Sequence, residues 1–358
     1  MKHLIDTLDL SVAEIDEMLE TALDIISHPA QYAHACDGKK IATLFFEPST
    51  RTRMSFEAAM YELGGHVLSM TDPATSSASK GESVADTARV VSCYADIIAI
   101  RHPKEGAALV AADHATVPVI NGGDGGHCHP TQTLADLLTI YREKGSFDSI
   151  TVGLCGDLLY GRTVHSLISA LARYKNVKFV LISPKELKLP EYLKKNISFA
   201  ETASLDEALP SLDVLYMTRI QRERFESPEA YWKLKDSYIL TAEKMEMAKR
   251  DCSIMHPLPR VNEISTGVDS DPRACYFRQA ENGKYMRMAL ILKLLKDAQD
   301  PTCIHSMGET GRRICNNPRC ITTTEQELVH RFRKDAYGVY RCVYCETAES
   351  GTKKESSK

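Results

Sequence analysis

Short β-rich runs alternate with longer helical patterns through residues 41–296 of this chain. Strands separated by helices pair in parallel, with right-handed crossovers, so the alternation predicts an α/β fold. The strands fall into two sets, which predicts two doubly wound parallel-sheet domains joined through a helix at 130–143. The expected strands are 41–46, 66–70, 96–100, 117–120, 150–155, 177–183, 213–217, 237–240 and 252–256, and the expected helices include 84–94, 130–143, 162–174 and 284–296.

The composition is that of an ordinary soluble globular protein, with 43% hydrophobic and 26% charged residues. The net charge of the whole chain, -4, does not indicate a protein that binds nucleic acid or an anionic membrane. The first residues lack an apolar signal core, and no apolar run approaches the ~20 residues of a membrane helix. We therefore expect a cytoplasmic protein with no membrane or nucleic-acid partner, in which the 11 cysteines stay reduced.

A dense run of hydroxyls and guanidiniums, P-S-T-R-T-R, follows the expected strand 41–46 and precedes a helical pattern that starts near Met54. Backbone N–H groups are free at the start of a helix, and the helix dipole favours an anion there. One Ser and one Arg alone would indicate an ordinary N-cap beside a solvated cation. The density of this run instead favours a phosphate site, because backbone, hydroxyl and guanidinium donors coincide. The expected ligands are Ser49, Thr50, Arg51 and Thr52.

Two further polar groups follow strands of the same set. Arg101 comes directly after 96–100, and His129 precedes Pro130 at the expected start of a helix. A helix start disfavours imidazolium, so a neutral His129 that donates to a carbonyl oxygen is a sensible role. The loop 121–128 contains four glycines and can approach a ligand closely. Ligands of open α/β sheets bind at the carboxyl ends of strands, where these residues are expected.

The second set of strands carries two arginines at strand ends. Arg162 follows 150–155 where a helix begins, and Arg219 follows 213–217. Guanidinium pairs with carboxylate through two hydrogen bonds, so two arginines facing one cleft suit a dicarboxylic amino acid. An ornithine-type substrate carries a side-chain cation that they would repel. Salt bridges that close the domains, to Glu47 or Glu223, are the alternative.

The chain loses its strand–helix alternation after Asp300 and becomes rich in cysteine. Cys315-x4-Cys320 and Cys342-x2-Cys345 form two pairs separated by 21 residues. Four thiolates in two such pairs predict a closed, tetrahedral structural zinc site. A segment this small, 303–348, should need zinc to fold. Residues 349–358 are polar and should form a disordered tail.

These motifs resemble the aspartate/ornithine carbamoyltransferase family. P-S-T-R-T-R at 48–53 resembles its carbamoyl-phosphate motif, and H-P-T-Q-T at 129–133 matches as well. G-R-T-x-H-S, T-R-x-Q and H-P-L-P-R, at 161–166, 218–221 and 256–260, resemble the aspartate branch. An S-M-G triplet typical of the ornithine branch occurs at 306–308. It lies past the last α/β helix, so we treat it as chance.

The resemblance implies transfer of the carbamoyl group from carbamoyl phosphate to the amine of aspartate, in pyrimidine synthesis, without an organic cofactor. The tetrahedral oxyanion and the leaving phosphate both need cations and donors, and the two reactants must be held together. Residues 1–130, with helix 284–300 packing back on them, are expected to bind carbamoyl phosphate, and residues 131–283 to bind aspartate. By resemblance, the catalytic residues are Arg51, Thr52, Arg101 and His129. The resemblance implies that the same four residues bind carbamoyl phosphate, together with Ser49, Thr50, Gln132, Ser76 and Lys80. It also implies that aspartate is bound by Lys80, Arg162, Arg219, Gln221, Leu258 and Pro259.

Two features bear on assembly. The polar loop 71–83 matches the family's S-x-x-x-K-G-E loop through Ser76 and Lys80, which implies a homotrimer with active sites shared between subunits. C-x-N-P-x-C-I-T and Y-R-C-x-Y-C-E resemble the zinc domain of the family's regulatory chain. We expect one structural zinc per chain, in a module fused to the catalytic part, that stabilises the trimer or pairs two trimers. The regulatory chain's nucleotide-binding domain has no counterpart, which leaves no basis for predicting nucleotide allostery.

Three other interpretations remain open. The chain could be a carbamoyltransferase for another amino acid, which activity with aspartate or ornithine would decide. It could be a zinc-ribbon nucleic-acid binder, because 330–334 is a small basic patch with one aromatic residue, and salt-sensitive binding would support this. It could be an inactive partner subunit, although the intact set of Arg51, Arg101, His129 and Gln132 argues against that.

Overall fold

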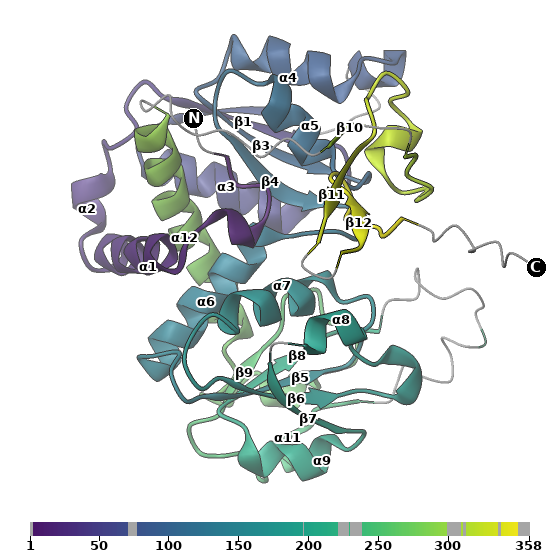
Figure 1. The fold of residues 1–358 in the computed structure, drawn as a ribbon. Coiled ribbons are helices and arrows are strands. Elements are labelled where there is room, and N and C mark those ends of the chain that lie inside the picture. Colours follow the sequence, from purple (N-terminus) through teal and green to yellow (C-terminus); the bar gives the residue numbers. More distant parts are fainter. Residues whose placement is uncertain are drawn as a thin grey trace, which may run out of the picture. The chain divides into compact units, whose positions relative to one another are not determined.

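The structure is a computed structural model, and it divides the chain into two compact units (Figure 1). Each unit has its own parallel sheet, which confirms the predicted α/β class. The described residues are 3–70, 77–195, 197–220, 229, 238–298, 309–310, 313–335 and 338–349. The first unit comprises Met1–Asp9, His28–Cys128 and Leu290–Lys358, and the second comprises Leu10–Ser27 and His129–Ala289.

The first unit is built on a four-stranded parallel sheet with the strand order β2-β1-β3-β4. The first strand of the chain, β1, is an inner strand of this sheet. The chain then adds β2 on one side of β1 and crosses over to add β3 on the other side. The connections therefore reverse between β1 and β3, and open α/β sheets bind ligands at such a reversal, outside the carboxyl ends of the two strands. The strands are β1 Lys40–Phe45, β2 His66–Met70, β3 Ile97–His102 and β4 Val119–Asp124.

Helices connect these strands and cover the sheet. α4 begins after Ser83, whose hydroxyl accepts a hydrogen bond of 3.1 Å from the backbone N–H of Asp86, which is a standard N-cap. α5 carries small buried residues, mostly alanine, which allow close packing on both sides of the helix. The helical elements of this unit are η1 Thr7–Asp9, α2 Pro29–Tyr32, α3 Thr50–Glu62, η3 Ser77–Lys80, α4 Val84–Ser92 and α5 Ala107–His114.

The second unit repeats this design with five parallel strands in the order β7-β6-β5-β8-β9. Here the connections reverse between β5 and β8. The strands are β5 Thr151–Cys155, β6 Lys178–Ile182, β7 Ser198–Thr202, β8 Val214–Met217 and β9 Ser253–Met255. The helical elements are α1 Val12–Ser27, α6 Pro130–Lys144, α7 Arg162–Leu171, η4 Lys185–Leu187, α8 Glu191–Lys194, α9 Leu205–Ala208, η5 Leu209–Ser211, α11 Ala242–Met245, η7 Thr266–Val268 and α12 Tyr276–Asp297, of which the last continues into the first unit.

Helix α1 packs with the second unit although it lies near the start of the chain. Its buried residues recur three or four positions apart, as in an amphipathic helix. The Arg173 side chain donates to the carbonyl of Leu10 at 2.8 Å, and the Tyr174 hydroxyl donates to Asp16 at 2.9 Å. The functional division expected at residue 130 stays a prediction, and the compact units separate beside it, between Cys128 and His129.

Several element boundaries differ from the expectations. The expected strand 237–240 is absent within the described residues, where Leu240 makes a single bridge to Ile264. β7 was not expected because four of its five residues are exposed, so it lacks an apolar run. β4 extends through Asn121 to Asp124, residues expected in a loop, and all six of its residues are buried. α12 begins at Tyr276 rather than at 284.

The cysteine-rich segment, described over 309–310, 313–335 and 338–349 and called the cysteine module below, forms an antiparallel sheet. It belongs to the first unit and shares a hydrophobic core with α4 and α5. Phe332 and Tyr344 are buried there with Ala107 and Ala111. The module therefore packs on its own chain. Its elements are β10 Glu309–Thr310, η8 Ile321–Thr323, β11 Arg331–Lys334 and β12 Tyr340–Cys342.

Gly106 marks the closest approach of the module to the sheet domain. Its φ is +88°, in the left-handed region that favours glycine. A Cβ atom at this position would lie 2.5 Å from the Cβ and 2.6 Å from the carbonyl oxygen of Tyr344. Only a residue without a side chain allows this contact.

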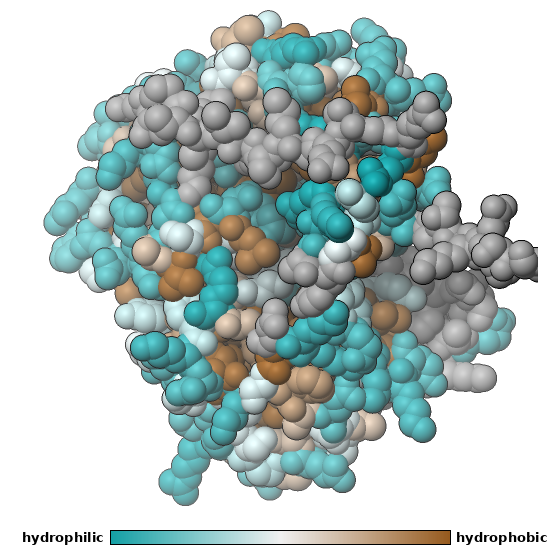
Figure 2. Space-filling view, in the orientation of Figure 1, coloured by the Kyte–Doolittle hydropathy of each residue, from teal (hydrophilic) through white to brown (hydrophobic). Residues whose placement is uncertain are grey.

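Figure 2 shows the hydropathy of the residues on one side of the protein. Hydrophilic side chains cover most of its described surface, and hydrophobic ones lie in small separate groups. No helix within the described ranges combines the length and apolar character that crossing a bilayer requires.

We predict that Gly106→Ala destabilises the protein more than the control Gly145→Ala. Both glycines have a positive φ, of +88° and +74°, so both variants carry a similar backbone strain. A Cβ at Gly145 meets nothing within 4 Å, whereas one at Gly106 overlaps Tyr344. The expected excess loss is about 1–3 kcal/mol of unfolding free energy. Calorimetry and limited proteolysis of the cysteine module measure it, and equal losses would contradict the contact.

Candidate active site and metal centre

The predicted phosphate ligands lie at the start of α3, directly beyond β1. Ser49 occupies the N-cap position with a non-helical backbone, and its side chain makes no capping hydrogen bond. Thr50, Arg51 and Thr52 form the first turn of this 13-residue helix. The helix start therefore presents N–H groups, hydroxyls and a guanidinium together, as an anion site requires.

Arg101 lies near the end of β3, the other strand at this reversal. It pairs with Phe45 in the sheet register, and its carbonyl accepts a hydrogen bond of 2.8 Å from the N–H of Phe46. Its guanidinium lies 2.6 Å from Glu47 and donates to the carbonyl of Gly122 at 3.2 Å. Burial, and then the charge of Arg101, lower the pKa of Arg51. Two guanidiniums that feel each other's charge favour an anion between them.

Lys80 is the last residue of the short η3, and its side chain is exposed. Ser76, the other residue predicted from this loop, lies outside the described residues, as does Gln221 of the predicted aspartate site. The roles predicted for these three residues stay predictions.

In the second unit, the reversal between β5 and β8 brings two arginine-bearing loops together. Gly156 follows β5 with a φ of +117°, and a Cβ there would lie 2.4 Å from the carbonyl oxygen of Thr218. Thr218 in turn donates its N–H to the carbonyl of Cys155 at 2.8 Å. Arg162 is the first residue of α7, and Arg219 follows Thr218. The two strand ends therefore bring both arginine-bearing segments to one edge of the sheet.

α6 supplies the next two predicted residues. His129 is its N-cap and is buried, and Pro130 occupies the first turn as expected. Gln132 lies in the same turn and is half-buried. Its side-chain amide donates to Asp136 at 2.8 Å, one turn further along the helix.

The loop that carries the predicted carbonyls of Leu258 and Pro259 is stabilised by its own internal hydrogen bonds. The N–H of Leu258 donates to His256 Nδ1 at 2.8 Å, so His256 Nε2 carries the proton that Glu263 accepts at 2.7 Å. Leu258 has a φ of +52°, and the Leu258–Pro259 peptide is cis. A bulky residue in the left-handed region is uncommon, and such conformations concentrate at functional sites.

Apart from Lys80, the described residues of the predicted site divide into two groups, one in each unit. The buried polar residues behind the second group, such as Asp136 and Gln279, were not predicted from the sequence. The position of Asp136, one helical turn after Gln132, was the only available signal, because the other members are distant in sequence. The first group holds Ser49, Thr50, Arg51, Thr52 and Arg101, and the second holds His129, Gln132, Arg162, Arg219, Leu258 and Pro259.

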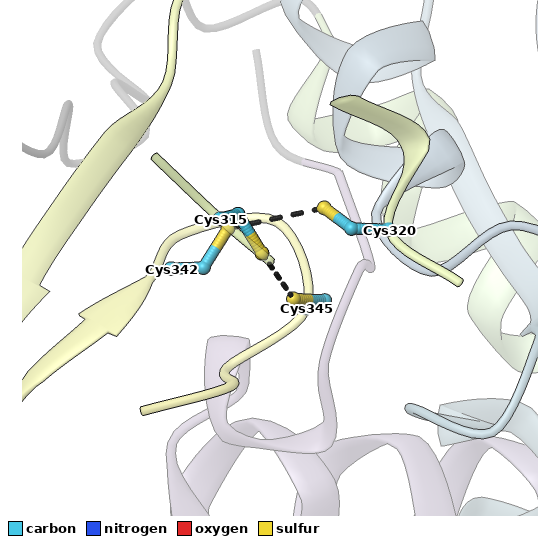
Figure 3. Close-up of side chains that lie close together, drawn as sticks. All are labelled: Cys315, Cys320, Cys342 and Cys345. Atoms are coloured by element: carbon cyan, nitrogen blue, oxygen red, sulfur yellow. Dashed lines mark hydrogen bonds between the residues drawn. The ribbon is translucent and has the colours of Figure 1, made fainter. Parts of the chain in front are cut away.

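The four cysteines predicted as metal ligands meet in the cysteine module (Figure 3). Their sulfur atoms all lie within 4.8 Å of one another, and all four residues are buried. The Cys315 and Cys345 sulfurs are 3.5 Å apart, and those of Cys320 and Cys342 are 3.9 Å apart. None of the four forms a disulfide. The cluster could hold a metal ion.

The cluster fits a tetrahedral thiolate-binding metal. Sulfurs at the usual Zn–S distance of about 2.3 Å from one zinc would be about 3.8 Å apart, close to the two spacings above. Burial raises the pKa of the Cys315 thiol to about 12, because the thiolate loses its hydration. A divalent cation among the sulfurs reverses this balance and favours the thiolate. The Thr322 hydroxyl, 3.2 Å from the Cys320 sulfur, adds a donor to it.

Glu105 joins the cysteine module to the loop that follows β3. Its backbone exchanges two hydrogen bonds of 2.9 Å with Arg319 and Ile321, on either side of the metal-ligand position Cys320. Its carboxylate accepts from Asn317 at 2.6 Å and lies 3.1 Å from the Arg319 guanidinium. The same carboxylate accepts the N–H of Gly126 at 3.3 Å. One buried carboxylate therefore contacts both the cysteine knuckle and the loop before His129.

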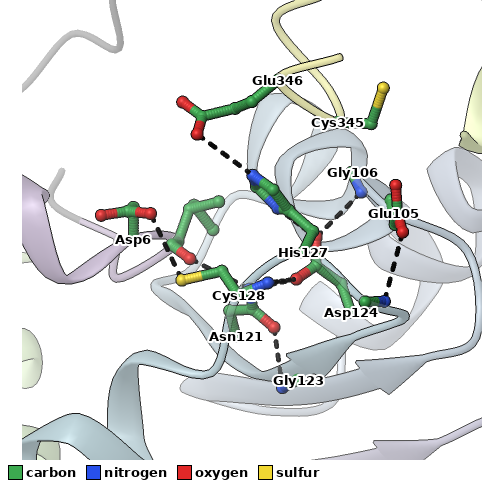
Figure 4. Close-up of polar contacts among 12 residues, drawn as sticks. Asp6, Glu105, Gly106, Asn121, Gly123, Asp124, His127, Cys128, Cys345 and Glu346 are labelled. Atoms are coloured by element: carbon green, nitrogen blue, oxygen red, sulfur yellow. Dashed lines mark hydrogen bonds and ion pairs between the residues drawn. The ribbon is translucent and has the colours of Figure 1, made fainter. Parts of the chain in front are cut away.

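His127 provides a second connection (Figure 4). Its Nδ1 lies 3.0 Å from Asp124, and its Nε2 lies 3.8 Å from Glu346, which follows Cys345 in the module. Burial alone would lower the pKa of His127, but the two carboxylates raise it well above its ordinary value. Asp124 also accepts from the backbone of Gly106 and Cys128, at 2.8 and 3.1 Å. The module thus contacts the segment that leads directly into His129.

The chain belongs to the aspartate/ornithine carbamoyltransferase family. Residues 2–142 match the family's carbamoyl-P binding domain, and residues 148–294 match its Asp/Orn binding domain. Residues 310–354 match the metal binding domain of the aspartate carbamoyltransferase regulatory chain. The resemblance predicted from the motifs is thereby confirmed for both parts of the chain.

Individual proteins similar to this chain are aspartate carbamoyltransferases, also called aspartate transcarbamoylases. The aspartate carbamoyltransferase catalytic subunit of Lachnoclostridium phytofermentans is 61% identical over 82% of this chain and 98% of that protein, and the Clostridium novyi subunit is 60% identical over the same shares. Among solved structures, the M. jannaschii aspartate transcarbamoylase catalytic subunit is 49% identical, with a TM-score of 0.78 over 84% of this chain and 100% of that chain. The Trypanosoma cruzi aspartate transcarbamoylase in complex with carbamoyl phosphate and aspartate is 39% identical, with a TM-score of 0.77 over 82% and 96%.

We predict that Cys320→Ser lowers the bound metal and unfolds the cysteine module, because three thiolates cannot close the site. Cys93→Ser is the matched control, since Cys93 is exposed and outside the cluster. Elemental analysis measures the metal, and hydrogen exchange over residues 313–349 measures the folding. The prediction fails if Cys320→Ser and Cys93→Ser keep equal metal and equal protection.

Proposed function

We infer that this chain transfers the carbamoyl group of carbamoyl phosphate to the amine of L-aspartate, giving N-carbamoyl-L-aspartate and phosphate. The reaction is an early step of pyrimidine synthesis. The observation that carries the inference is 61% identity to a catalytic subunit of that activity over 98% of its length. The Trypanosoma cruzi relative, solved with carbamoyl phosphate and aspartate, supports both substrates.

The group in the first unit binds carbamoyl phosphate. Ser49, Thr50 and Thr52 donate hydroxyls to the phosphate, beside the N–H groups that begin α3. Arg51 and Arg101 neutralise the leaving group, and the two close guanidiniums are the support for this role. Glu47 holds Arg101 in place until the anion arrives.

The reaction proceeds by direct attack. The amine adds to the carbamoyl carbon, the carbonyl oxygen becomes an oxyanion, and the intermediate then expels phosphate. Arg51, Thr52, Arg101 and His129 stabilise the oxyanion, and neither a covalent enzyme intermediate nor an organic cofactor is involved. The rate gain also comes from holding the two reactants side by side. The N-cap position of His129 supports a neutral imidazole that donates to the oxygen.

The group in the second unit binds aspartate. Arg162 and Arg219 each hold a carboxylate, and their positions after β5 and β8 support this assignment. Gln221 adds an amide, and the carbonyls of Leu258 and Pro259 accept from the substrate amine and the carbamoyl nitrogen. A cationic side chain such as that of ornithine would be repelled by both arginines.

The active unit is a homotrimer in which Lys80 and Ser76 act in the site of the adjoining subunit, on carbamoyl phosphate, with Lys80 also on aspartate. The exposed position of Lys80 on the short η3 supports a reach beyond its own subunit. The roles are carried over from the family's S-x-x-x-K-G-E loop.

The cysteine module binds one structural zinc per chain and is a fusion of a regulatory-type domain to a catalytic chain. The sulfur spacing and the match of residues 310–354 support this. We further propose that the module stabilises the trimer or pairs two trimers. Measuring the mass of the assembly before and after zinc removal tests this point, and an unchanged assembly would defeat it.

The protein acts in the cytoplasm, where clustered thiols stay reduced. A nucleic-acid role for the basic patch is disfavoured by its contacts. Arg331 is paired with Asp113, Arg333 is paired with Glu346, and Phe332 is 2% exposed. Paired arginines and a buried aromatic ring leave little to bind phosphates and bases.

We predict turnover of carbamoyl phosphate with L-aspartate and at least about a hundredfold lower kcat/KM with L-ornithine, because two guanidiniums oppose its side-chain cation. Release of phosphate and formation of carbamoyl product are measured together. Arg219→Met, which keeps length but removes charge, should raise the KM for aspartate far more than that for carbamoyl phosphate. Preference for ornithine would assign the chain to another carbamoyltransferase.

We predict that Lys80→Ala loses most activity while the trimer stays folded. Arg51→Ala should be equally inactive, because it removes the phosphate cation. If each site combines Arg51 of one subunit with Lys80 of its neighbour, reassembling an equal mixture of the two variants restores both residues in about a quarter of the sites. Sedimentation confirms the trimers, and turnover is then measured. Near-normal activity of Lys80→Ala, or no recovery in the mixture, would remove the shared-site proposal.

A further inference from the structure

A buried polar network lies behind Gln132 in the second unit. Its centre is Asp136 on α6, whose side chain is fully buried. One carboxylate oxygen, Oδ1, accepts from the amide nitrogens of Gln132 at 2.8 Å and of Gln279 at 2.6 Å. The other oxygen, Oδ2, accepts from the Tyr216 hydroxyl at 2.9 Å. A buried carboxylate is tolerated here because each oxygen is hydrogen-bonded.

Gln279, on α12, has an orientation that its neighbours fix at both ends. Its oxygen accepts the backbone N–H of His256 at 2.9 Å, and a backbone N–H can only donate. Its nitrogen must therefore face Asp136. Through Gln279, Asp136 also supports the loop 256–263, where His256 in turn accepts from Leu258 at 2.8 Å.

The same logic fixes the amide of Gln132. Oδ1 of Asp136 accepts from the Gln279 amide, so it presents a lone pair rather than a proton to Gln132. The nitrogen of Gln132 then faces Asp136, and its oxygen is the atom available to a ligand. Gln132 is half-buried while Asp136 behind it is fully buried, so Gln132 is the member of this pair nearer the surface.

Protonation of Asp136 does not disturb this orientation. Burial raises the pKa of Asp136 to about 7, against the opposing hydrogen bonds from Gln132, Gln279 and Tyr216 and the charge of Arg287. A proton fits on Oδ2, because the Tyr216 hydroxyl can accept as well as donate. Oδ1 has two amide donors in either state and remains an acceptor.

We propose that Asp136 is a positioning residue that makes the site selective for the carbamoyl group over other acyl phosphates. It turns the Gln132 oxygen outward and, through Gln279, supports the loop that carries the Leu258 and Pro259 carbonyls. The Gln132 oxygen and these backbone carbonyls are acceptors for the carbamoyl NH2, and an acetyl group has no NH2 to donate to them. The proposal rests on the proposed function, since it assigns the amide recognition of that same site.

Binding of carbamoyl phosphate and acetyl phosphate, without aspartate, tests this proposal. The two ligands share the phosphate and the carbonyl and differ only in NH2 against CH3. In Asp136→Ala the Kd of carbamoyl phosphate should rise about tenfold or more, while that of acetyl phosphate changes less than about threefold. Asp136→Asn keeps an oxygen that can face both amides, so it should retain most of the wild-type selectivity. A parallel loss for both ligands in Asp136→Ala would overturn the proposal.

Two further variants separate selectivity from folding. Thr139→Val removes a buried hydrogen-bonding group from the same helix, where Thr139 accepts from Asn282, and should leave the ratio of the two Kd values unchanged. Gln279→Met frees the His256 loop and should raise the Kd of carbamoyl phosphate alone, by about threefold to tenfold. If Asp136→Ala fails to fold, Gln279→Met replaces it in the test. An unchanged ratio of the Kd values for carbamoyl phosphate and acetyl phosphate in Gln279→Met would then overturn the proposal.

The wild-type protein distinguishes the two levels of inference. If it binds carbamoyl phosphate and carbamoylates aspartate while Asp136→Ala keeps full selectivity, the positioning role fails and the proposed function stands. If the wild-type protein binds no carbamoyl phosphate, the proposed function fails, and this inference fails with it.

Discussion

Reversal of the strand order in each parallel sheet is the constraint on which the site depends. Between β1 and β3, and between β5 and β8, successive crossovers leave in opposite directions, and ligands of open α/β sheets bind at such points, outside the carboxyl ends of the strands. Arg51 and Arg101 meet at the first reversal, and the arginine-bearing loops after β5 and β8 meet at the second. The functional groups are otherwise far apart in sequence, and the sheets bring each group together.

The cysteine module adds a second constraint, because it contacts the segment before His129. Glu105 contacts both the knuckle around Cys320 and the N–H of Gly126, and His127 lies between Asp124 and Glu346. The fold of the module and the path of this segment therefore depend on the same side chains.

Patterns in the sequence predicted most strands because the central ones are continuous apolar runs. They failed where burial did not follow hydropathy. β7 is an exposed edge strand, and β4 continues through two buried glycines, of which Gly122 lies against Phe45 and Ile100. The candidate site residues were found because each lies beside a strand end or helix start. The network of Asp136, Gln279 and Tyr216 was not, because single polar residues on separate elements carry no local pattern.

The α/β class, the polar groups that follow the strands and the cluster of four cysteines could all be predicted from the residues, because they depend on local periodicity and on the spacing of a few reactive side chains. Tertiary structure alone decided three things: that α1 packs with the second unit, that the cysteine module docks on its own chain at Gly106 and Glu105, and that a buried carboxylate orients Gln132. The first two depend on contacts between segments far apart along the chain, and the third depends on Gln279 and Tyr216, which reach Asp136 from distant elements. Packing and the need to satisfy every buried polar group select these arrangements.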